Sequence, residues 1–246
     1  MPQIYLSPST QEFNNYINGG TEEQYMNLIA DYMEPYLVAS GVEFERNTPE
    51  MTAASSIAAS NAGNFDLHLA IHSNAAPESL AGRLQGTDVY YSPRSVQGKR
   101  AADIIAANFK KIYPDPALVK AVPTTSIGEV TRTRAPAVLI EVAYHDNLDD
   151  ANWIKNNLRD IARNLAQSVT EFLGVPFVNP QPQYTGVVTL QSGNLNIRSR
   201  PTYDGTILTQ APNGAELEIL GSYDGWYVVN YQGTVGYARS EFITIL

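Results

Sequence analysis

Short apolar runs alternate with segments of helical spacing from the N-terminus to about residue 174, and this alternation restricts the fold more than any other feature. The strongest apolar run is AVLIEVAY at 137–144, and FDLHLAIHSNA at 65–75 is the second. Segment 21–38 has helical spacing, with one apolar face made by Met26, Ile29, Ala30, Met33 and Leu37. Apolar strands that alternate with helices predict an α/β fold, a mostly parallel sheet with helices on both faces. In such sheets, reactive groups gather at the carboxyl ends of the strands.

The sequence changes character near residue 177. Residues 177–184, FVNPQPQY, contain two prolines and no charge, which indicates a stiff extended linker. From residue 185 onward, short strand-like runs are separated by turn residues such as PTYDG and PNG, with no segment of helical length. We therefore expect three parts: an α/β domain over 1–176, a linker over 177–184 and a small all-β barrel over 185–246.

Composition removes several classes of function. The chain has 246 residues and a net charge of −9, which disfavours nucleic acid and anionic membranes as partners. It has no cysteine, which excludes a thiol nucleophile, a zinc finger and a disulfide scaffold, so that histidine and oxygen ligands must hold any metal. No apolar run reaches the ~18 residues of a membrane span, so we expect no membrane insertion. The first residues, MPQIYLSPST, lack a secretory pattern, which predicts synthesis in the cytoplasm and release by lysis or a nonclassical route.

The C-terminal segment carries LNIRSRP, then PNGAELEIL, then GWYVVNYQGTVGYARSEFI. This series resembles the bacterial SH3-like (SH3b) domains, and the match covers almost the whole of 185–246. The resemblance implies binding to the cell wall through aromatic side chains, with Tyr203, Trp226 and Tyr227 as the candidates and Tyr237 beside them. The competing interpretation is that these aromatic residues form the core of a small barrel.

Three residues of the first domain are candidates for metal binding or acid–base catalysis. His72 lies near the end of one apolar strand, Glu141 lies within the most apolar stretch of the chain, and Glu23 begins a predicted helix. A buried carboxylate needs a cation, a metal or a catalytic task. Zinc hydrolases use this set of residue types, because carboxylate and imidazole hold the ion while a second carboxylate moves the proton of its bound water.

The same region resembles the zinc-dependent N-acetylmuramoyl-L-alanine amidases of the Amidase_3 type over residues 1–174. The matching pieces are EEQYMNLIA, FDLHLAIHSNA, GTDVYY, RAPAVLIEVAYHDN and IARNLAQSVTEFLG. The resemblance implies that Glu23 and His72 bind Zn²⁺ and that Glu141 is the catalytic acid and base. The implied reaction is hydrolysis of the peptidoglycan amide between N-acetylmuramic acid and L-Ala. The combination with SH3b resembles autolysins and phage endolysins.

One departure from this family concerns the first zinc-binding histidine, which normally follows the first strand. Here the turn reads LSPSTQEF, with Thr10 or a neighbour in that place, and no histidine precedes residue 68. We expect His145, four residues after Glu141, to be the third ligand. One alternative is that Gln11 or a Ser/Thr hydroxyl oxygen is a weak third ligand. The other is that the domain binds metal poorly and does not catalyse. We expect His68 to be structural, because four strand residues, about 13 Å, separate it from His72.

Two further residues are candidates for contact with substrate. Asn74 follows the His72 strand and Arg134 precedes the Glu141 strand; a turn role for Asn74 and a surface role for Arg134 are equally open. Three functions compete at this point. The first is a zinc amidase directed to the wall, the second is a metal-poor binding protein with an amidase-like fold, and the third is a glycoside hydrolase with paired carboxylates.

Overall fold

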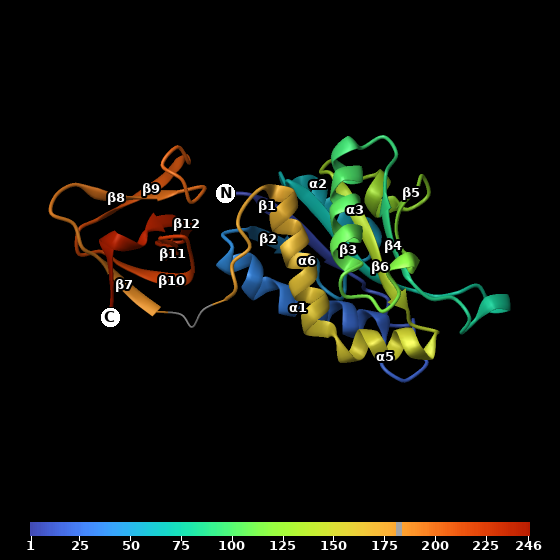
Figure 1. Cartoon of the computed structure of the whole chain (residues 1–246). Coiled ribbons are helices and arrows are strands. Elements are labelled where there is room, and N and C mark those ends of the chain that lie inside the picture. The colour runs from blue at the N-terminus through green and yellow to red at the C-terminus, as the bar shows by residue number, and fades with distance from the viewer. Residues whose placement is uncertain (181–183) are drawn as a thin grey trace. The chain divides into compact units, whose positions relative to one another are not determined.

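The structure, a computed structural model, describes residues 1–180 and 184–246 (Figure 1). The chain forms two compact units, one of residues 3–34 with 44–173, the other of residues 1–2, 35–43 and 174–246. Each is described by itself below. Residues 181–183 of the predicted linker lie outside the described residues, and the predicted domain limits of 176 and 185 remain predictions.

A six-stranded sheet organises the first unit. Its strands are β1 (Gln3–Pro8), β2 (Glu43–Arg46), β3 (Leu67–Asn74), β4 (Thr87–Tyr91), β5 (Val119–Pro123) and β6 (Ala137–Tyr144). They lie in the order β2-β1-β3-β6-β4-β5. The pairs β1–β3, β3–β6 and β4–β5 are parallel, whereas β4 runs antiparallel to β6. The predicted fold class is confirmed, and the one reversed strand pair and the edge strand β5 were not foreseen.

Helices cover both faces of this sheet. They are α1 (Glu22–Ala39), α2 (Ala53–Ala62), α3 (Val96–Phe109), α4 (Gly128–Thr131), α5 (Leu148–Asn156) and α6 (Leu158–Leu173). Helices α3 and α6 pack against each other and lie in front of the sheet in Figure 1. On one face of the sheet, Val130 of α4 packs against Ala70, Ala137 and Leu139. The described part of the chain has no helix long and apolar enough to cross a membrane.

Helix α1 shows how local sequence sets the first unit. The hydroxyl of Thr21 accepts a hydrogen bond from the backbone N–H of Gln24 at 3.2 Å, which satisfies a free donor of the first turn. Glu22 and Glu23 follow in that turn, where the helix dipole favours acidic residues. The five apolar residues of the predicted face, Met26, Ile29, Ala30, Met33 and Leu37, are all fully buried. The start of α1 is thereby fixed beside the ends of β1 and β3.

The second unit contains one antiparallel sheet. Its strands are β7 (Tyr184–Val188), β8 (Asn194–Arg198), β9 (Ile207–Pro212), β10 (Glu216–Tyr223), β11 (Trp226–Tyr231), β12 (Thr234–Arg239) and β13 (Ile243–Ile245). Their order is β13-β7-β10-β11-β12-β8-β9. The strands enclose a core of small and branched apolar residues, including Leu195, Ile197, Leu217, Ile219 and Val229. Strands β9 and β13 were not expected from the sequence.

Candidate functional site

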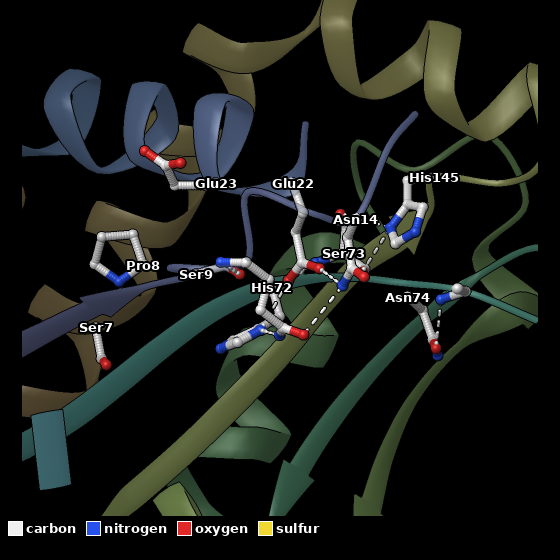
Figure 2. A network of polar contacts seen from close by, with 12 residues as sticks. Ser7, Pro8, Ser9, Asn14, Glu22, Glu23, His72, Ser73, Asn74 and His145 are labelled. Atoms are coloured by element: carbon white, nitrogen blue, oxygen red, sulfur yellow. Dashed lines mark hydrogen bonds and ion pairs between the residues drawn. The ribbon is translucent and has the colours of Figure 1, made fainter. Parts of the chain in front are cut away.

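Two of the predicted reactive residues, His72 and Glu141, meet where β3 and β6 approach their carboxyl ends. His72 and Glu141 are direct partners in the parallel register of β3 and β6, so their side chains leave the same face of the sheet. Asp88 of β4 is the partner of Glu141 on its other side. The first turn of α1 lies above His72 (Figure 2).

Glu22 is the carboxylate of α1 that reaches this site. Its Oε1 lies 2.8 Å from Nδ1 of His72, and the Asn14 amide donates to its Oε2 at 2.6 Å. The residue is only 1 % exposed. Burial alone would raise the pKa of Glu22, but hydrogen bonds from His72 and Asn14 and the charge of the imidazolium hold it below its ordinary value.

Glu23, the expected carboxylate ligand, points away from His72, and its neighbour Glu22 is the residue that reaches the imidazole (Figure 2). Glu23 lines an open pocket with Gln11, Phe13 and Glu50, among others. Helical spacing in the sequence distinguishes Glu22 from Glu23. Glu22 stands four residues before Met26 and so continues the buried stripe of the helix, whereas Glu23 lies about 100° away from it.

A second carboxylate holds the other side of His72, and sequence reasoning missed it. Oε2 of Glu129 in α4 lies 3.3 Å from Nε2 of His72, and its Oε1 lies 3.3 Å from Nε2 of His68. Both nitrogens of His72 therefore face carboxylate oxygens. Burial would lower the pKa of His72, but the hydrogen bonds to Glu129 and Glu22 outweigh it and raise the pKa to about 10.

Glu141 differs from both of these carboxylates. Its Oε2 is buried and has no hydrogen-bond partner within the described residues. Burial raises the pKa of Glu141 to about 7; the charges of Glu22 and Asp88 add to the rise, and His72 opposes it. A carboxyl group with this pKa exchanges protons readily near neutral pH, which suits a general acid and base.

His145, the expected third ligand, faces another way. Its Nδ1 lies 3.1 Å from Oγ of Ser73 and 3.0 Å from the Ser73 carbonyl oxygen, and its ring stacks on Tyr16 at 5.3 Å. The reason is its backbone: the His145 N–H donates to the carbonyl of Asn74, which turns the chain back over the end of β3. The group that faces His72 Nδ1 instead is the Gln11 amide, whose Nε2 lies 3.3 Å away. Asn14 donates to the Gln11 oxygen at 3.1 Å.

The remaining predicted residues are spread over both units. The Asn74 side chain accepts a hydrogen bond from the N–H of Ala75, as a turn residue does. Arg134 is exposed, and its guanidinium donates to the backbone oxygen of Asn61, at the end of α2. His68 is fully buried between Ser60 and Glu129, and its expected structural role stays a prediction.

The aromatic candidates of the second unit have different surroundings. Trp226 is buried at 5 % exposure and Tyr203 is 67 % exposed, and their rings meet edge to face at 5.5 Å. The Arg239 guanidinium lies within 6 Å of both ring centres, at 5.8 Å from Tyr203 and 5.5 Å from Trp226. Tyr227 is partly buried against the barrel core, and Tyr237 is fully buried. Tyr203 and Arg239 are thus the groups of this cluster that solvent reaches.

The donor set determines what metal this site can take. No cluster of three or more His, Asp or Glu side chains suited to a metal ion is found in residues 1–180 and 184–246. Two strong donors converge, Oε1 of Glu22 and Nδ1 of His72, and the Gln11 amide is the third group at that point. Beside them lies the unpartnered buried oxygen of Glu141. The arrangement offers a divalent cation two strong ligands, and the oxygen of Gln11, the one neutral candidate, accepts a hydrogen bond from Asn14 while its amide nitrogen faces His72.

Comparison with solved structures shows the same fold in cell-wall amidases. The catalytic domain of CwlV, an N-acetylmuramoyl-L-alanine amidase of Bacillus (Paenibacillus) polymyxa var. colistinus, is 18% identical; the match covers 72% of this chain and 100% of that one, with a TM-score of 0.61. The N-acetylmuramoyl-L-alanine amidase AmiC2 of Nostoc punctiforme is 14% identical; the match covers 70% of this chain and 97% of that one, with a TM-score of 0.62. The catalytic domain of the CD27L endolysin targeting Clostridia difficile is 19% identical; the match covers 70% of this chain and 98% of that one, with a TM-score of 0.58.

The search of curated proteins finds no significant match. Two family models do match the sequence. Residues 10–173 match the model for N-acetylmuramoyl-L-alanine amidases, and residues 193–244 match the bacterial SH3 domain. The first match covers more than half of the chain and includes Glu22, His72 and Glu141. The chain therefore belongs to the N-acetylmuramoyl-L-alanine amidase family, with a bacterial SH3 domain after its amidase domain.

Proposed function

We propose that this chain hydrolyses the amide bond between N-acetylmuramic acid and L-Ala in peptidoglycan, at a zinc site formed by Glu22, His72 and the Gln11 amide. The observation that carries the proposal is the unpartnered, buried oxygen of Glu141 beside the converging Glu22–His72 pair. A purely structural role does not explain this carboxyl group, because burying a carboxyl group without a hydrogen-bond partner lowers the stability of the fold. Membership of the amidase family supports the reaction type.

Each residue has a defined task in this reaction. Zinc, when bound, would supply a Lewis acid that lowers the pKa of its bound water and polarises the amide carbonyl. Glu141 takes a proton from the attacking water and returns it to the leaving amine of L-Ala. Asn14 holds Glu22 in place through the 2.6 Å hydrogen bond to Oε2, which leaves Oε1 directed to His72. We infer that Asn74, two residues beyond His72 at the end of β3, contacts the peptide.

The SH3 domain would keep the enzyme on the wall. Tyr203 and Arg239 offer an exposed ring and a cation next to each other, and Trp226 supports both from below. Aromatic faces pack on sugar rings and peptide backbone, and a guanidinium pairs with carboxylates. We infer that this cluster is the wall-binding surface, while Tyr227 and Tyr237 belong to the packing of the barrel.

The test uses purified peptidoglycan and the full chain. Digestion is expected to release new L-Ala amino groups and no new reducing sugar ends; chelator abolishes the activity and zinc restores it. Glu141→Gln is expected to be folded and inactive, with Glu23→Gln as the matched control that stays active. New reducing ends would instead indicate glycoside hydrolysis, and full activity of Glu141→Gln would refute the assigned role.

A second candidate function has one observation in its favour. Among the described residues, two strong ligands converge where catalytic zinc sites use three protein ligands, which suits a wall-binding protein that has lost its metal. Zinc content separates the two. A stoichiometric ion after purification or zinc addition supports the amidase, whereas no binding at micromolar zinc supports the binding protein.

A further inference from the structure

An exposed lysine lies in line with the carboxylate of Glu141, two strands away. Glu141 of β6 is the register partner of Asp88 on β4, and Asp88 is in turn the register partner of Lys120 on β5. Direct partners on neighbouring strands project from the same face of a sheet, so these three side chains form one row. Because β5 is the edge strand, the row runs from the reactive centre to the rim of the sheet.

The face that carries this row is open over β4 and β5. The alternate residues of the two strands, Val89 and Val119, are buried on the opposite face, where α3 contacts both strands. On the open face, Lys120 is exposed and Asp88 is half-buried. A ligand at Glu141 therefore has free space on the β4 side.

A second row of residues gives this open face an apolar floor. Tyr90 of β4 has Leu139 of β6 and Val122 of β5 as its direct partners. Tyr90 and Val122 are half-buried, and Tyr90 packs against the apolar cluster that includes Leu139. The open face thus combines a half-exposed ring and a branched side chain with the charged row beside them, which suits a peptide laid across the strands.

The cation of Lys120 is available to a ligand. The ion pairs within residues 1–180 and 184–246 do not include it. Its charge acts on the row all the same, because burial raises the pKa of Asp88 and Lys120 opposes this rise. At the other end, the carboxylates of Glu22, Glu129 and Glu141 gather around His72. A substrate carboxylate is therefore repelled at the reactive centre and attracted near Lys120.

The proposed reaction fixes which half of the substrate crosses this face. Glu141 returns a proton to the leaving amine of L-Ala, so this nitrogen lies against Glu141 and the acyl half of the bond lies on the side of His72. The bond then points from β3 toward β6, and the stem peptide continues over β4 and β5.

The distance to Lys120 indicates which peptide residue it meets. Two strand spacings, about 10 Å, separate the backbone at Glu141 from the backbone at Lys120. An extended peptide covers that distance in about three residues. The long, flexible lysine side chain shortens the gap, which brings its ammonium group to the second residue of the peptide.

We propose that Lys120 pairs with a carboxylate on the second residue of the stem peptide and so selects peptides that are acidic at that position. The proposal rests on the proposed function, because the task of Glu141 sets where L-Ala lies. Lys120 is a specificity-determining residue, since it touches the peptide away from the reacting atoms. Lysine on an edge strand also prevents pairing with other chains, but that role alone predicts no difference between acidic and amidated peptides.

Two small substrates that differ at a single carboxylate test the proposal. One is MurNAc-L-Ala-γ-D-Glu-L-Lys with an amidated C-terminus, and the other has the α-carboxylate of its second residue amidated as well. The values of kcat/KM are measured from new L-Ala amino groups for the full chain, for Lys120→Gln and Lys120→Glu, and for Lys110→Gln, the same exchange at an exposed lysine that ends α3.

The wild type and Lys110→Gln are expected to prefer the acidic compound about five- to tenfold. Lys120→Gln should lose this preference and Lys120→Glu should reverse it. The ratio of two rates from one protein preparation does not depend on how much of a variant is folded. Equal rates of the wild type on the two compounds, or an unchanged ratio in Lys120→Gln, overturn the proposal.

Failure of the proposed function gives a different result. If digestion of purified peptidoglycan releases no L-Ala amino groups, the amidase assignment fails, and the dissociation constants of the two intact compounds replace the rates. Tighter binding of the acidic compound that Lys120→Gln removes then supports the role of Lys120, whereas equal or absent binding overturns it.

Discussion

Removing the charge of Glu141 should make the metal-free protein more stable at alkaline pH. Glu141→Gln keeps the shape of the side chain and removes the ionisation. In the folded chain, burial raises the pKa of this carboxyl from 4.5 to about 7. Because the folded pKa lies above the unfolded one, folding favours the protonated form. The wild type therefore has its full stability below pH 4.5 and loses part of it as the pH rises through about 7.

The magnitude follows from the same two pKa values. A rise from 4.5 to about 7, at 1.36 kcal/mol for each unit, corresponds to about 3 kcal/mol. The glutamine variant does not suffer this loss, and it gives up no hydrogen bond of Oε2, which has no partner among the described residues. Relative to the wild type, it should gain up to about 3 kcal/mol in free energy of unfolding between pH 4.5 and pH 8.5.

Urea unfolding in the presence of chelator measures this difference. Both proteins are unfolded at several pH values, and the free energies are extrapolated to water with a common slope. Glu23→Gln serves as the control, because it makes the same exchange at a carboxylate that lines an open pocket. A constant difference between Glu141→Gln and the wild type across the pH range would refute the reasoning from burial.

Three other outcomes are expected. Glu22→Gln should lower zinc affinity and amidase activity at least about 100-fold while Glu23→Gln stays within about threefold, which chelator competition and peptidoglycan digestion measure; equal losses would contradict the placement of Glu22. Gln11→His should tighten zinc binding at least about tenfold by supplying a second imidazole, and unchanged affinity would remove Gln11 from the ligand set. Tyr203→Ala should abolish binding to purified cell walls in a pull-down and leave the melting temperature unchanged. Trp226→Ala should instead lower the free energy of unfolding of the SH3 domain by about 3–5 kcal/mol and so unfold it. Wall binding that survives Tyr203→Ala would place the binding surface elsewhere.

Part of this site could be predicted because strand periodicity is local. The apolar runs around His72 and Glu141 are long enough to fix both strands, and neighbouring parallel strands bring their carboxyl ends to one edge. The start of α1 was equally readable, since Thr21 and the two acidic residues after it form a common helix start.

The rest depended on packing that sequence spacing does not record. Glu129 lies in a four-residue helix with no periodicity, and only the tertiary fold brings it to His72. His145 follows β6 closely, but a backbone hydrogen bond to Asn74 turns its ring toward Ser73. The reversed direction of β4 relative to β6 is likewise a property of sheet order, because β4 is antiparallel to β6 and parallel to β5, and its own sequence does not say which strands lie beside it.

Because β4 runs antiparallel to β6, the connection between β3 and β4 lies at the same edge of the sheet as His72 and Glu141. The segment over 75–86 leaves the sheet just after Asn74 and returns at Thr87, next to Asp88 and Glu141, so it starts and finishes at the reactive edge. Most of it is exposed, including the short turn Glu78–Leu80, and two backbone N–H groups donate to the carboxylate of Asp146. Insertions or exchanges in this connection would reshape the rim that an incoming glycan strand meets and leave the buried framework untouched, which makes it the natural place for such enzymes to diverge in the walls they attack.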